Sequence, residues 1–257
     1  MISLRFFGTG ALDSFRIKNK LSKEYRRFST LLIDEKIIID PSEDIFEFVE
    51  SFMLQGILND VNDVFITHSH IDHFSISAIE RLASDKRIRV YASSAMKDEI
   101  LSIKNVDYVE ICPFAIQKIG KYTVLPLPAN HKTDIPAEIT LNYLIECDEK
   151  KLFYGLDGAF VNPAAMEILK EVTLDAAILD CALGTDGYSE KSANHNNLDM
   201  VRTIYEIFIA SGTANDSTKF ILSHIPALKK RLMHDEMCEA VADSPFKIAY
   251  DGYFLGI

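Results

Sequence analysis

Cysteine is scarce in this sequence, and the few cysteines present are isolated from one another. Cys112, Cys147, Cys181 and Cys238 are far apart and form no C-x-x-C pair. This pattern argues against a disulfide framework and against a zinc knuckle built from thiolates. Unpaired thiols are typical of a reducing compartment, so we predict a cytoplasmic location.

The sequence also lacks long apolar runs and obvious domain linkers. No apolar run reaches the roughly 18 residues that a membrane-spanning helix needs. Residues 1–7 lead directly into a glycine turn without a cleavable signal pattern, so we expect them to form a first strand. No linker rich in proline, glycine or serine and no internal repeat divides the chain. We therefore predict a single domain that spans residues 1–257.

Positive charge is in short supply. The 27 lysines and arginines are outnumbered by 38 acidic residues, which gives a net charge of −11. This balance argues against general nucleic-acid binding, which relies on cationic side chains to neutralise phosphates. It does not exclude a small anionic substrate, because two divalent ions can make a pocket locally positive. A small anionic molecule is therefore the partner we expect.

The segment 13–28 departs from this acidic balance, because it carries six lysines and arginines against two acidic residues. Local positive charge of this kind can attract an anionic substrate to the rim of a site. A charge run is also typical of a solvated loop that binds nothing. The sequence leaves both interpretations open.

What is present is a cluster of metal-ligand side chains directly after an apolar strand. The strand is expected at Val64–Ile66, and the cluster that follows contains His68, His70, Asp72 and His73. Residues two apart in an extended chain point the same way, so the first two histidines can bind one metal ion. The next two ligands lie where the chain must turn and can face a second ion. Solvated loop histidines are the alternative, but three of the seven histidines fall within these six positions.

Single chemistry-bearing residues follow other β-rich runs in the same way. His131 follows the run at 122–128, Asp157 follows the strand at 151–154, and His224 follows the strand at 219–223. Each alone would fit a surface loop or a turn. His195 precedes a helix expected at 198–210, and its neutral-range pKa suits proton transfer, although helix-flanking solvation is the alternative.

Strands and helical stripes alternate along most of the chain. Helices are expected at 43–58, 75–84, 93–101, 198–210 and 227–242, with His234 on the surface of the last. Hairpins are expected at 29–40 and 139–154. This alternation predicts an α/β protein in which helices pack on sheets.

The H-x-H-x-D-H pattern resembles that of the metallo-β-lactamase superfamily. The resemblance implies a four-layer αββα sandwich with a metal site at one edge of two facing sheets. It implies that His68, His70, His131 and Asp157 hold one ion, and that Asp72, His73, His224 and Asp157 hold the other. Nitrogen and carboxylate ligands suit zinc first and also manganese or iron. In this family an aspartate placed like Asp40 supports a ligand, whereas the sequence alone allows a turn or cap role equally well.

Within the superfamily, the chain is most similar to the cyclic-phosphate phosphodiesterase and RNase Z-like group. Beside the metal motif, the similarity rests on Gly8-Thr9-Gly10, Arg27-x-Ser29, His195 and the Y-D-G near the C-terminus. It implies that a hydroxide held by two metals attacks a small phosphodiester or cyclic phosphate. Asp72 and His195 are then the catalytic candidates, with His195 protonating the leaving oxygen. The resemblance to this family also implies a homodimer.

Two features known in that group are absent, namely the cysteine-rich knuckle that some members carry in the first loop and a long arm for tRNA. Their absence leaves other functions open. The same centre could hydrolyse a lactone or a thioester. A mononuclear iron oxidoreductase is less compatible with His73 beside Asp72, and a non-catalytic metal-binding protein would have no evident need for two complete sites.

Overall fold

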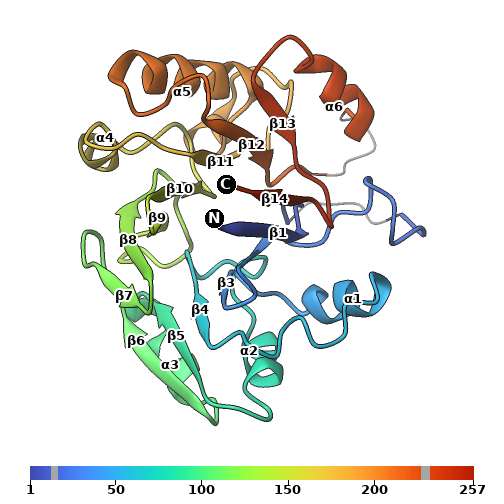
Figure 1. Cartoon of the computed structure of the whole chain (residues 1–257), viewed down its shortest axis with the longest axis vertical. Coiled ribbons are helices and arrows are strands. Elements are labelled where there is room, and N and C mark those ends of the chain that lie inside the picture. The colour runs from blue at the N-terminus through green and yellow to red at the C-terminus, as the bar shows by residue number, and fades with distance from the viewer. Residues whose placement is uncertain (13–16, 227–231) are drawn as a thin grey trace.

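The computed structural model describes residues 1–12, 17–226 and 232–257. In these residues two seven-stranded sheets pack face to face, and helices cover the outer side of each sheet (Figure 1). The predicted α/β class and the αββα sandwich are therefore confirmed. The predicted helix at 93–101 corresponds to η1 (Ser94–Met96) followed by α3 (Lys97–Leu101).

The first sheet has the strand order β14-β1-β2-β3-β4-β5-β6. These strands are β14 (Phe254–Gly256), β1 (Ser3–Gly8), β2 (Thr30–Ile33), β3 (Ile37–Ile39), β4 (Asp63–Phe65), β5 (Ile88–Ala92) and β6 (Val106–Glu110). The strand expected at the N-terminus is confirmed, and it pairs with the C-terminal strand, so both ends of the chain lie side by side (Figure 1). Strands β3 to β6 run parallel to one another.

The second sheet has the order β13-β12-β11-β10-β9-β8-β7. These strands are β13 (Phe246–Ile248), β12 (Lys219–Ser223), β11 (Ala176–Asp180), β10 (Lys150–Gly155), β9 (Leu141–Cys147), β8 (Tyr122–Pro128) and β7 (Gln117–Ile119). Strands β10 to β13 are parallel, whereas β7 to β10 are antiparallel. Both predicted hairpins, β2 with β3 and β9 with β10, are confirmed.

Alternating side chains explain why the central strands are apolar throughout. In β3, Ile37 and Ile39 join the core between the sheets, while Ile38 packs under the helices of the first sheet. In β10, Tyr154 faces the core between the sheets and Phe153 faces the helices of the second sheet. A strand that is buried on both faces gains from an apolar side chain at every position.

Helices α1 (Asp44–Ser51), α2 (Ile76–Leu82) and α3 cover the first sheet. Helices α4 (Pro163–Leu169), α5 (Leu198–Ser211) and α6 (His234–Ala240) cover the second, and η2 (Glu190–Ala193) precedes α5. Together they bury the apolar stripes that the sequence displays. None of the helices in the described residues is long and apolar enough to cross a membrane.

Two predicted helices are longer in the sequence interpretation than in the structure. The helix expected at 43–58 stops at Ser51, because Phe52 caps it and Met53 adopts a left-handed conformation with φ of 52°. The helix expected at 227–242 begins only at His234, and residues 227–231 lie outside the described part of the chain. In the first of these helices, apolar spacing continues past the point where the backbone turns.

Part of the basic segment is buried. Arg26 and Arg27 are only 2% and 0% exposed. For these two residues, both interpretations of the segment are therefore wrong: they neither attract a substrate at the rim of a site nor belong to a solvated loop. Arg27 pairs with Asp251 at 3.1 Å, and Arg26 donates to Thr9 Oγ1 at 2.8 Å. Residues 13–16 of the segment lie outside the described part. The Gly8-Thr9-Gly10 turn and the C-terminal Y-D-G are therefore joined by buried guanidinium groups.

The expectation that His234 lies on the surface is wrong, since it is only 3% exposed. Its Nδ1 atom lies 3.3 Å from Arg26 Nη2, and its Nε2 atom lies 3.5 Å from Cys238 Sγ. An imidazole beside a buried guanidinium accepts its hydrogen bond best when neutral. Burial and the positive charge of Arg26 lower the pKa of His234 to about 4.

This neutral histidine predicts a loss of stability in acid. Because its pKa is lower in the folded chain than the usual value of about 6.5, the unfolded chain binds more protons as the pH falls. The stability that neutral His234 contributes is fully present above about pH 6.5 and is lost as the pH falls toward 4. Between pH 7.5 and pH 5 the free energy of unfolding of the wild type should fall. We expect this fall to be about 1–2 kcal/mol smaller in His234→Asn. Urea denaturation at both pH values measures this, and equal losses would contradict it.

Candidate metal centre

The candidate site lies at the edge where strands of both sheets end. The segment after β4 carries the H-x-H-x-D-H motif, and Asp40 follows the neighbouring strand β3. From the second sheet, Asp157 follows β10 and His224 follows β12. Carboxyl ends of neighbouring parallel strands meet at one edge of a sheet, which is where ligands of open α/β sheets bind.

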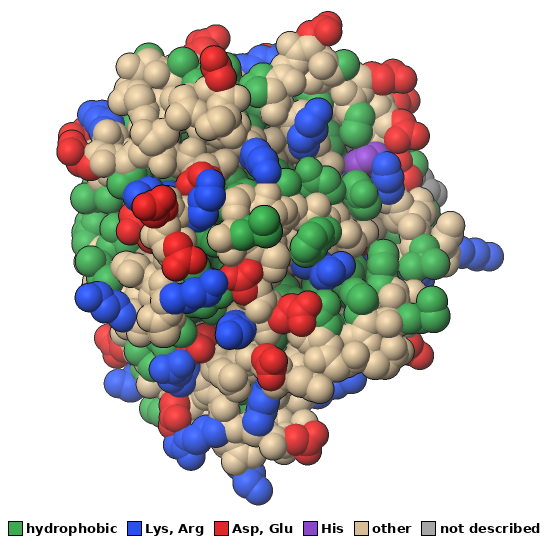
Figure 2. All heavy atoms as spheres, viewed as in Figure 1, with side chains coloured by type: hydrophobic (Ala, Val, Ile, Leu, Met, Phe, Trp, Pro, Cys, Tyr) green, Lys and Arg blue, Asp and Glu red, His purple; other side chains and the backbone are tan. Residues whose placement is uncertain are grey.

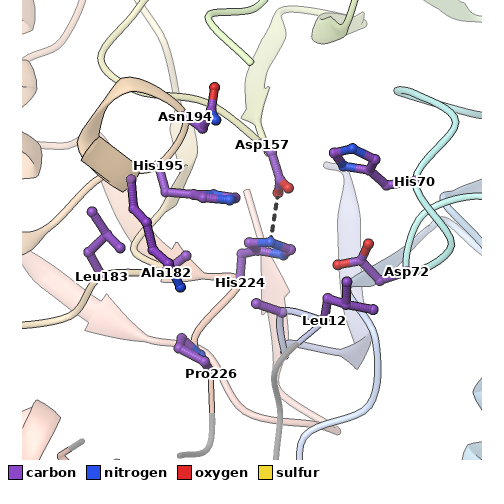
Figure 3. Close-up of a pocket in the computed structure, with 12 residues that line it drawn as sticks. Leu12, His70, Asp72, Asp157, Ala182, Leu183, Asn194, His195, His224 and Pro226 are labelled. Carbon is purple, nitrogen blue, oxygen red and sulfur yellow. Dashed lines mark ion pairs between the residues drawn. The ribbon is translucent and has the colours of Figure 1, made fainter. Parts of the chain in front are cut away.

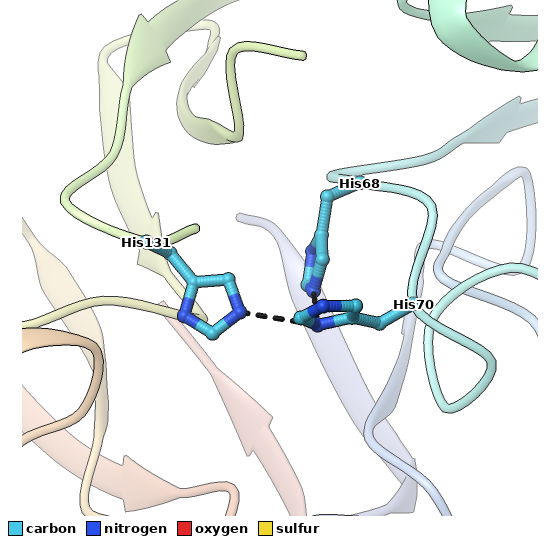
Figure 4. A group of neighbouring side chains, drawn as sticks. All are labelled: His68, His70 and His131. Carbon is cyan, nitrogen blue, oxygen red and sulfur yellow. Dashed lines mark hydrogen bonds between the residues drawn. The ribbon is translucent and has the colours of Figure 1, made fainter. Parts of the chain in front are cut away.

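Three predicted ligands of the first ion point at one another. His68 Nε2 lies 3.0 Å from His70 Nδ1, and His131 Nε2 lies 3.2 Å from the same atom (Figure 4). Although His131 is distant in sequence, the end of β8 brings it against the motif. Three imidazole nitrogens that converge in this way can be ligands of one cation.

The predicted ligands of the second ion gather around Asp157. His224 Nε2 lies 3.0 Å from Asp157 Oδ1, and His73 Nε2 lies 3.4 Å from Asp157 Oδ2. Asp72 Oδ2 is 3.6 Å from His73 Nε2. Asp157 Oδ2 is also 3.8 Å from His131 Nε2. Asp157 therefore lies close to both groups, and Figure 3 shows its carboxylate paired with His224, with His70 beside it.

Two atoms of this cluster test whether a cation fits. His73 Nε2 and Asp157 Oδ1 are buried, and neither forms a hydrogen bond within the described residues. Buried polar atoms are rarely left without a partner, because their desolvation is then uncompensated. A divalent ion among these nitrogen and carboxylate donors would satisfy them, and the donor set suits zinc, manganese or iron. The residues present fit a metal centre.

The electrostatics of Asp157 and His68 point the same way. Burial would raise the pKa of Asp157, but His224 and His73 outweigh it and hold that pKa well below the usual range. Burial lowers the pKa of His68 well below its usual value, and the neighbouring His73 adds to this effect. An ionised carboxylate and a neutral imidazole are the forms that bind metals. His73 differs, because burial would lower its pKa, but the carboxylates of Asp157, Asp72 and Asp40 outweigh burial and raise that pKa well above its usual value.

Hydrogen bonds behind the cluster orient its histidines. His73 Nδ1 lies 2.8 Å from Asp40 Oδ2, and Asp40 accepts two further bonds from Thr67, at 2.8 Å each. His131 Nδ1 donates to the carbonyl of Asn194 at 3.0 Å. Both contacts leave Nε2 free to face the centre. Of the two roles left open for Asp40, the structure favours support of a ligand.

His224 is oriented by Ser29. In the sequence, this serine stood out only as part of the Arg27-x-Ser29 pattern. The Ser29 hydroxyl donates to the Gly10 carbonyl at 3.1 Å and lies 3.0 Å from His224 Nδ1. Since the hydroxyl proton is committed to the carbonyl, Ser29 accepts the Nδ1 proton of His224. That tautomer leaves Nε2 unprotonated on the side of Asp157.

We expect Ser29→Ala to weaken metal binding at the centre by about 10- to 100-fold, because outer hydrogen bonds orient and strengthen histidine ligands. Titration of metal-stripped protein against a chelating indicator measures the affinity of each bound ion. Ser42→Ala is the matched control, because it removes a buried hydroxyl that has no partner among the described residues. Unchanged affinities in the Ser29 variant would show that the contact is only structural.

His195 forms a second, distinct pair in the site. Its Nδ1 atom lies 2.7 Å from Asp180 Oδ2, and its ring stacks on His224 with centroids 5.5 Å apart. Burial alone would lower the pKa of His195, but the Asp180 carboxylate outweighs it and raises that pKa to about 9. Asp180 is itself fully buried and accepts the Ala182 amide at 2.8 Å. Asp180 thereby orients His195 so that its ring faces the predicted ligands (Figure 3).

Two residues of the site were not singled out from the sequence. Asp180 could have been found, because it ends a buried strand as Asp40 does. Glu138 could not, since it lies in an irregular loop; it accepts bonds from the amide and hydroxyl of Ser69, at 3.0 and 2.5 Å. Glu138 thus ties the segment between His68 and His70 to the loop that follows His131.

The centre opens into a cavity of about 290 Å³. The lining residues that carry chemistry are His70, Asp72, Asp157, Lys191, His195 and His224 (Figure 3). Both catalytic candidates, Asp72 and His195, therefore reach the same space. Elsewhere on the surface, Figure 2 shows acidic and basic side chains interspersed over one face rather than gathered by sign.

Comparison with known proteins identifies related sequences and folds. A model of the beta-lactamase superfamily domain matches residues 35–225. Ribonuclease Z of Methanopyrus kandleri is 28% identical over 154 residues, which cover 56% of this chain and 50% of that protein. The chain thus spans about half the length of this relative.

Similar solved structures share the fold at low sequence identity. Zinc-bound PqqB of Methylobacterium extorquens has a TM-score of 0.75 and 14% identity, with 99% and 100% of the two chains covered. Yeast PDE1 has a TM-score of 0.70 and 11% identity, with coverage of 100% and 99%. The short form of human tRNase Z has a TM-score of 0.67 and 16% identity, with 99% of each chain covered. At these identities the likeness concerns the fold.

Proposed function

The chain belongs to the β-lactamase superfamily as a metallo-hydrolase, and we propose that it hydrolyses a small phosphodiester or a cyclic phosphate. The observation that supports this substrate class most directly is the Asp180–His195 pair beside the centre. Cleavage of an alkyl phosphodiester releases an alkoxide, which is a poor leaving group unless a proton reaches it. A histidine held by a buried carboxylate, with its other nitrogen directed at the reaction space, can supply that proton.

We propose that His68, His70, His131 and Asp157 hold one metal ion, and that Asp72, His73, His224 and Asp157 hold a second. Two such ions would polarise a phosphoryl oxygen and lower the pKa of water near them. Zinc suits these donors best, and manganese and iron remain the alternatives. The ions would also offset the acidic charge of the chain where an anionic substrate binds.

Other residues around the centre orient the predicted ligands and the proton donor. Asp40 and Ser29 fix the tautomers of His73 and His224, so their Nε2 atoms are available to the centre. Asp180 fixes the ring of His195, with Nδ1 on the carboxylate and Nε2 toward the cavity. The proton that His195 holds at Nε2 is the one we assign to the leaving oxygen.

The relatives support the same substrate class. One is a ribonuclease Z by name, and the fold neighbours include a tRNase Z and PDE1. Because the alignment covers only half of the ribonuclease and the identities of the structures are low, we do not extend tRNA processing to this chain. A small substrate also agrees with the net charge of −11.

The test is hydrolysis of bis(p-nitrophenyl) phosphate by metal-stripped protein refilled separately with zinc and manganese. We expect activity to return with at least one of the metals. A lactone and a thioester are assayed in parallel, because the same fold could direct water at a carbonyl. Protein that contains two ions, ignores the phosphodiester and cleaves a carbon ester would overturn the proposed substrate.

A further inference from the structure

A second cavity, of about 450 Å³, lies on the His70 side of the centre. It shares two lining residues, His70 and Leu12, with the cavity over the predicted ligands. The two spaces are therefore neighbours across a predicted metal ligand. A substrate whose reacting group sits at the centre can extend past His70 into this second space.

The walls of this second cavity are unusually apolar for surface residues. Ile71 is 70% exposed, Leu12 is 50% exposed and Ile135 is 39% exposed, and all three line it. Phe74 and Met96 complete the apolar lining. Single exposed apolar side chains need no explanation, but several around one concave space next to a reaction centre are typical of a ligand site.

The charged groups of the cavity have one sign. Glu99 and Asp134 line it, and neither lysine nor arginine does so among the described residues. On the other side of the centre, a cavity next to His131 is lined by Lys132 instead. The two sides of the centre thus differ in charge. A second anionic group of a substrate would be repelled on the His70 side and accepted more readily on the His131 side.

We propose that the cavity on the His70 side is a subsite for an apolar, uncharged or cationic substituent of the substrate, such as an aromatic ring. The proposal deepens the phosphodiester assignment and rests on it for the identity of the reacting group. Ring burial between Leu12, Ile71 and Ile135 supplies the affinity. The carboxylates of Glu99 and Asp134 supply the discrimination against anionic substituents.

Equilibrium binding to the metal-loaded protein tests this without turnover. The probes are methylphosphonate, phenylphosphonate and 4-carboxyphenylphosphonate, measured by calorimetry. We expect the phenyl compound to bind at least about tenfold more tightly than the methyl compound. The added carboxylate is expected to cancel most of that gain. Acetohydroxamate and benzohydroxamate form a second pair, because hydroxamates bind divalent metals whatever the phosphoryl preference of the site.

Two variants locate the effect. Ala95→Phe fills the cavity from its wall and should remove the phenyl gain while methylphosphonate binding is unchanged. Ala164→Phe adds the same ring to the exposed surface of α4 and serves as the matched control.

The two head groups separate the possible failures. Absence of a phenyl gain in both pairs would overturn the subsite and leave the phosphodiester assignment standing. A gain seen only with hydroxamates, with no phosphonate bound, would keep the subsite and count against the phosphodiester assignment. A phenyl gain that survives Ala95→Phe would place the ring elsewhere and overturn the subsite.

Discussion

Asp157→Asn is expected to lower hydrolytic activity at least roughly a thousandfold and to reduce the bound metal from two ions to one or none. The side chain keeps its shape, but it loses the charge and one of the two oxygens that face the histidine groups. Asp157 Oδ1 lies 3.0 Å from His224 of the second group and Oδ2 lies 3.8 Å from His131 of the first, and no other described carboxylate is grouped with histidines of both. Elemental analysis of the purified variant, together with its phosphodiesterase rate, measures both effects.

Asp63→Asn is the matched control for this change. Asp63 is also a buried aspartate, but it pairs with Arg89 at the start of β4, at the opposite end of the strand from the motif. We expect it to lose some stability and to retain both ions. Full metal content and activity in the Asp157 variant would remove the basis for a bridging carboxylate.

The second large effect is expected from His195→Ala, and it should depend on the leaving group. For a cyclic phosphate with an alkoxide leaving group, we expect kcat to fall by about 10²- to 10⁴-fold. For bis(p-nitrophenyl) phosphate the loss should be much smaller, because p-nitrophenolate is stable without a proton. Metal content should be unchanged, since His195 is not one of the predicted ligands and its Nδ1 atom is paired with Asp180.

Steady-state rates on the two substrates give this comparison directly. Asp180→Asn should show the same pattern with a smaller loss, because it removes the carboxylate that orients His195 and keeps the imidazole. Equal losses on both substrates would mean that His195 does not protonate the leaving oxygen. Lost metal in His195→Ala would instead indicate a ligand role for this histidine.

Much of the fold follows from local patterns that the chain displays. The apolar runs of β4, β10 and β12 predict buried strands because they have to fill two faces at once. Turn and cap residues then punctuate them, as at the positive-φ turn of Asp34 and Glu35 between β2 and β3. Helix ends were less predictable, since the stripe that includes Phe52 continues past the left-handed Met53.

The candidate ligands were predictable for a related reason. Each follows a strand, and an imidazole or carboxylate directly after a buried apolar run has few structural uses. The motif at 68–73 predicts metal binding by itself. His131, Asp157 and His224 become candidate ligands only when they are considered together with this motif. The spatial convergence of the four segments is a property of the two sheets.

Supporting contacts were beyond the reach of the sequence. The bond from His224 to Ser29 joins residues 195 positions apart, and the Arg27–Asp251 pair joins residues 224 apart. The Arg26 and Arg27 side chains read as surface charge, because no local pattern distinguishes a solvated arginine from one that a distant carboxylate neutralises. His234 was misread in the same way.

By itself, the sequence determined the layered α/β class, the metal-binding chemistry and the strand ends that carry it, because periodicity and side-chain type are local properties. The tertiary structure alone decided which nitrogen of each histidine faces the centre, that Asp180 holds His195, and that an apolar cavity adjoins His70. These depend on residues that are distant in the chain and meet only when the two sheets close on each other. The physical reason is that hydrogen bonds and cavities are set by positions in space, and those positions follow from packing the whole chain.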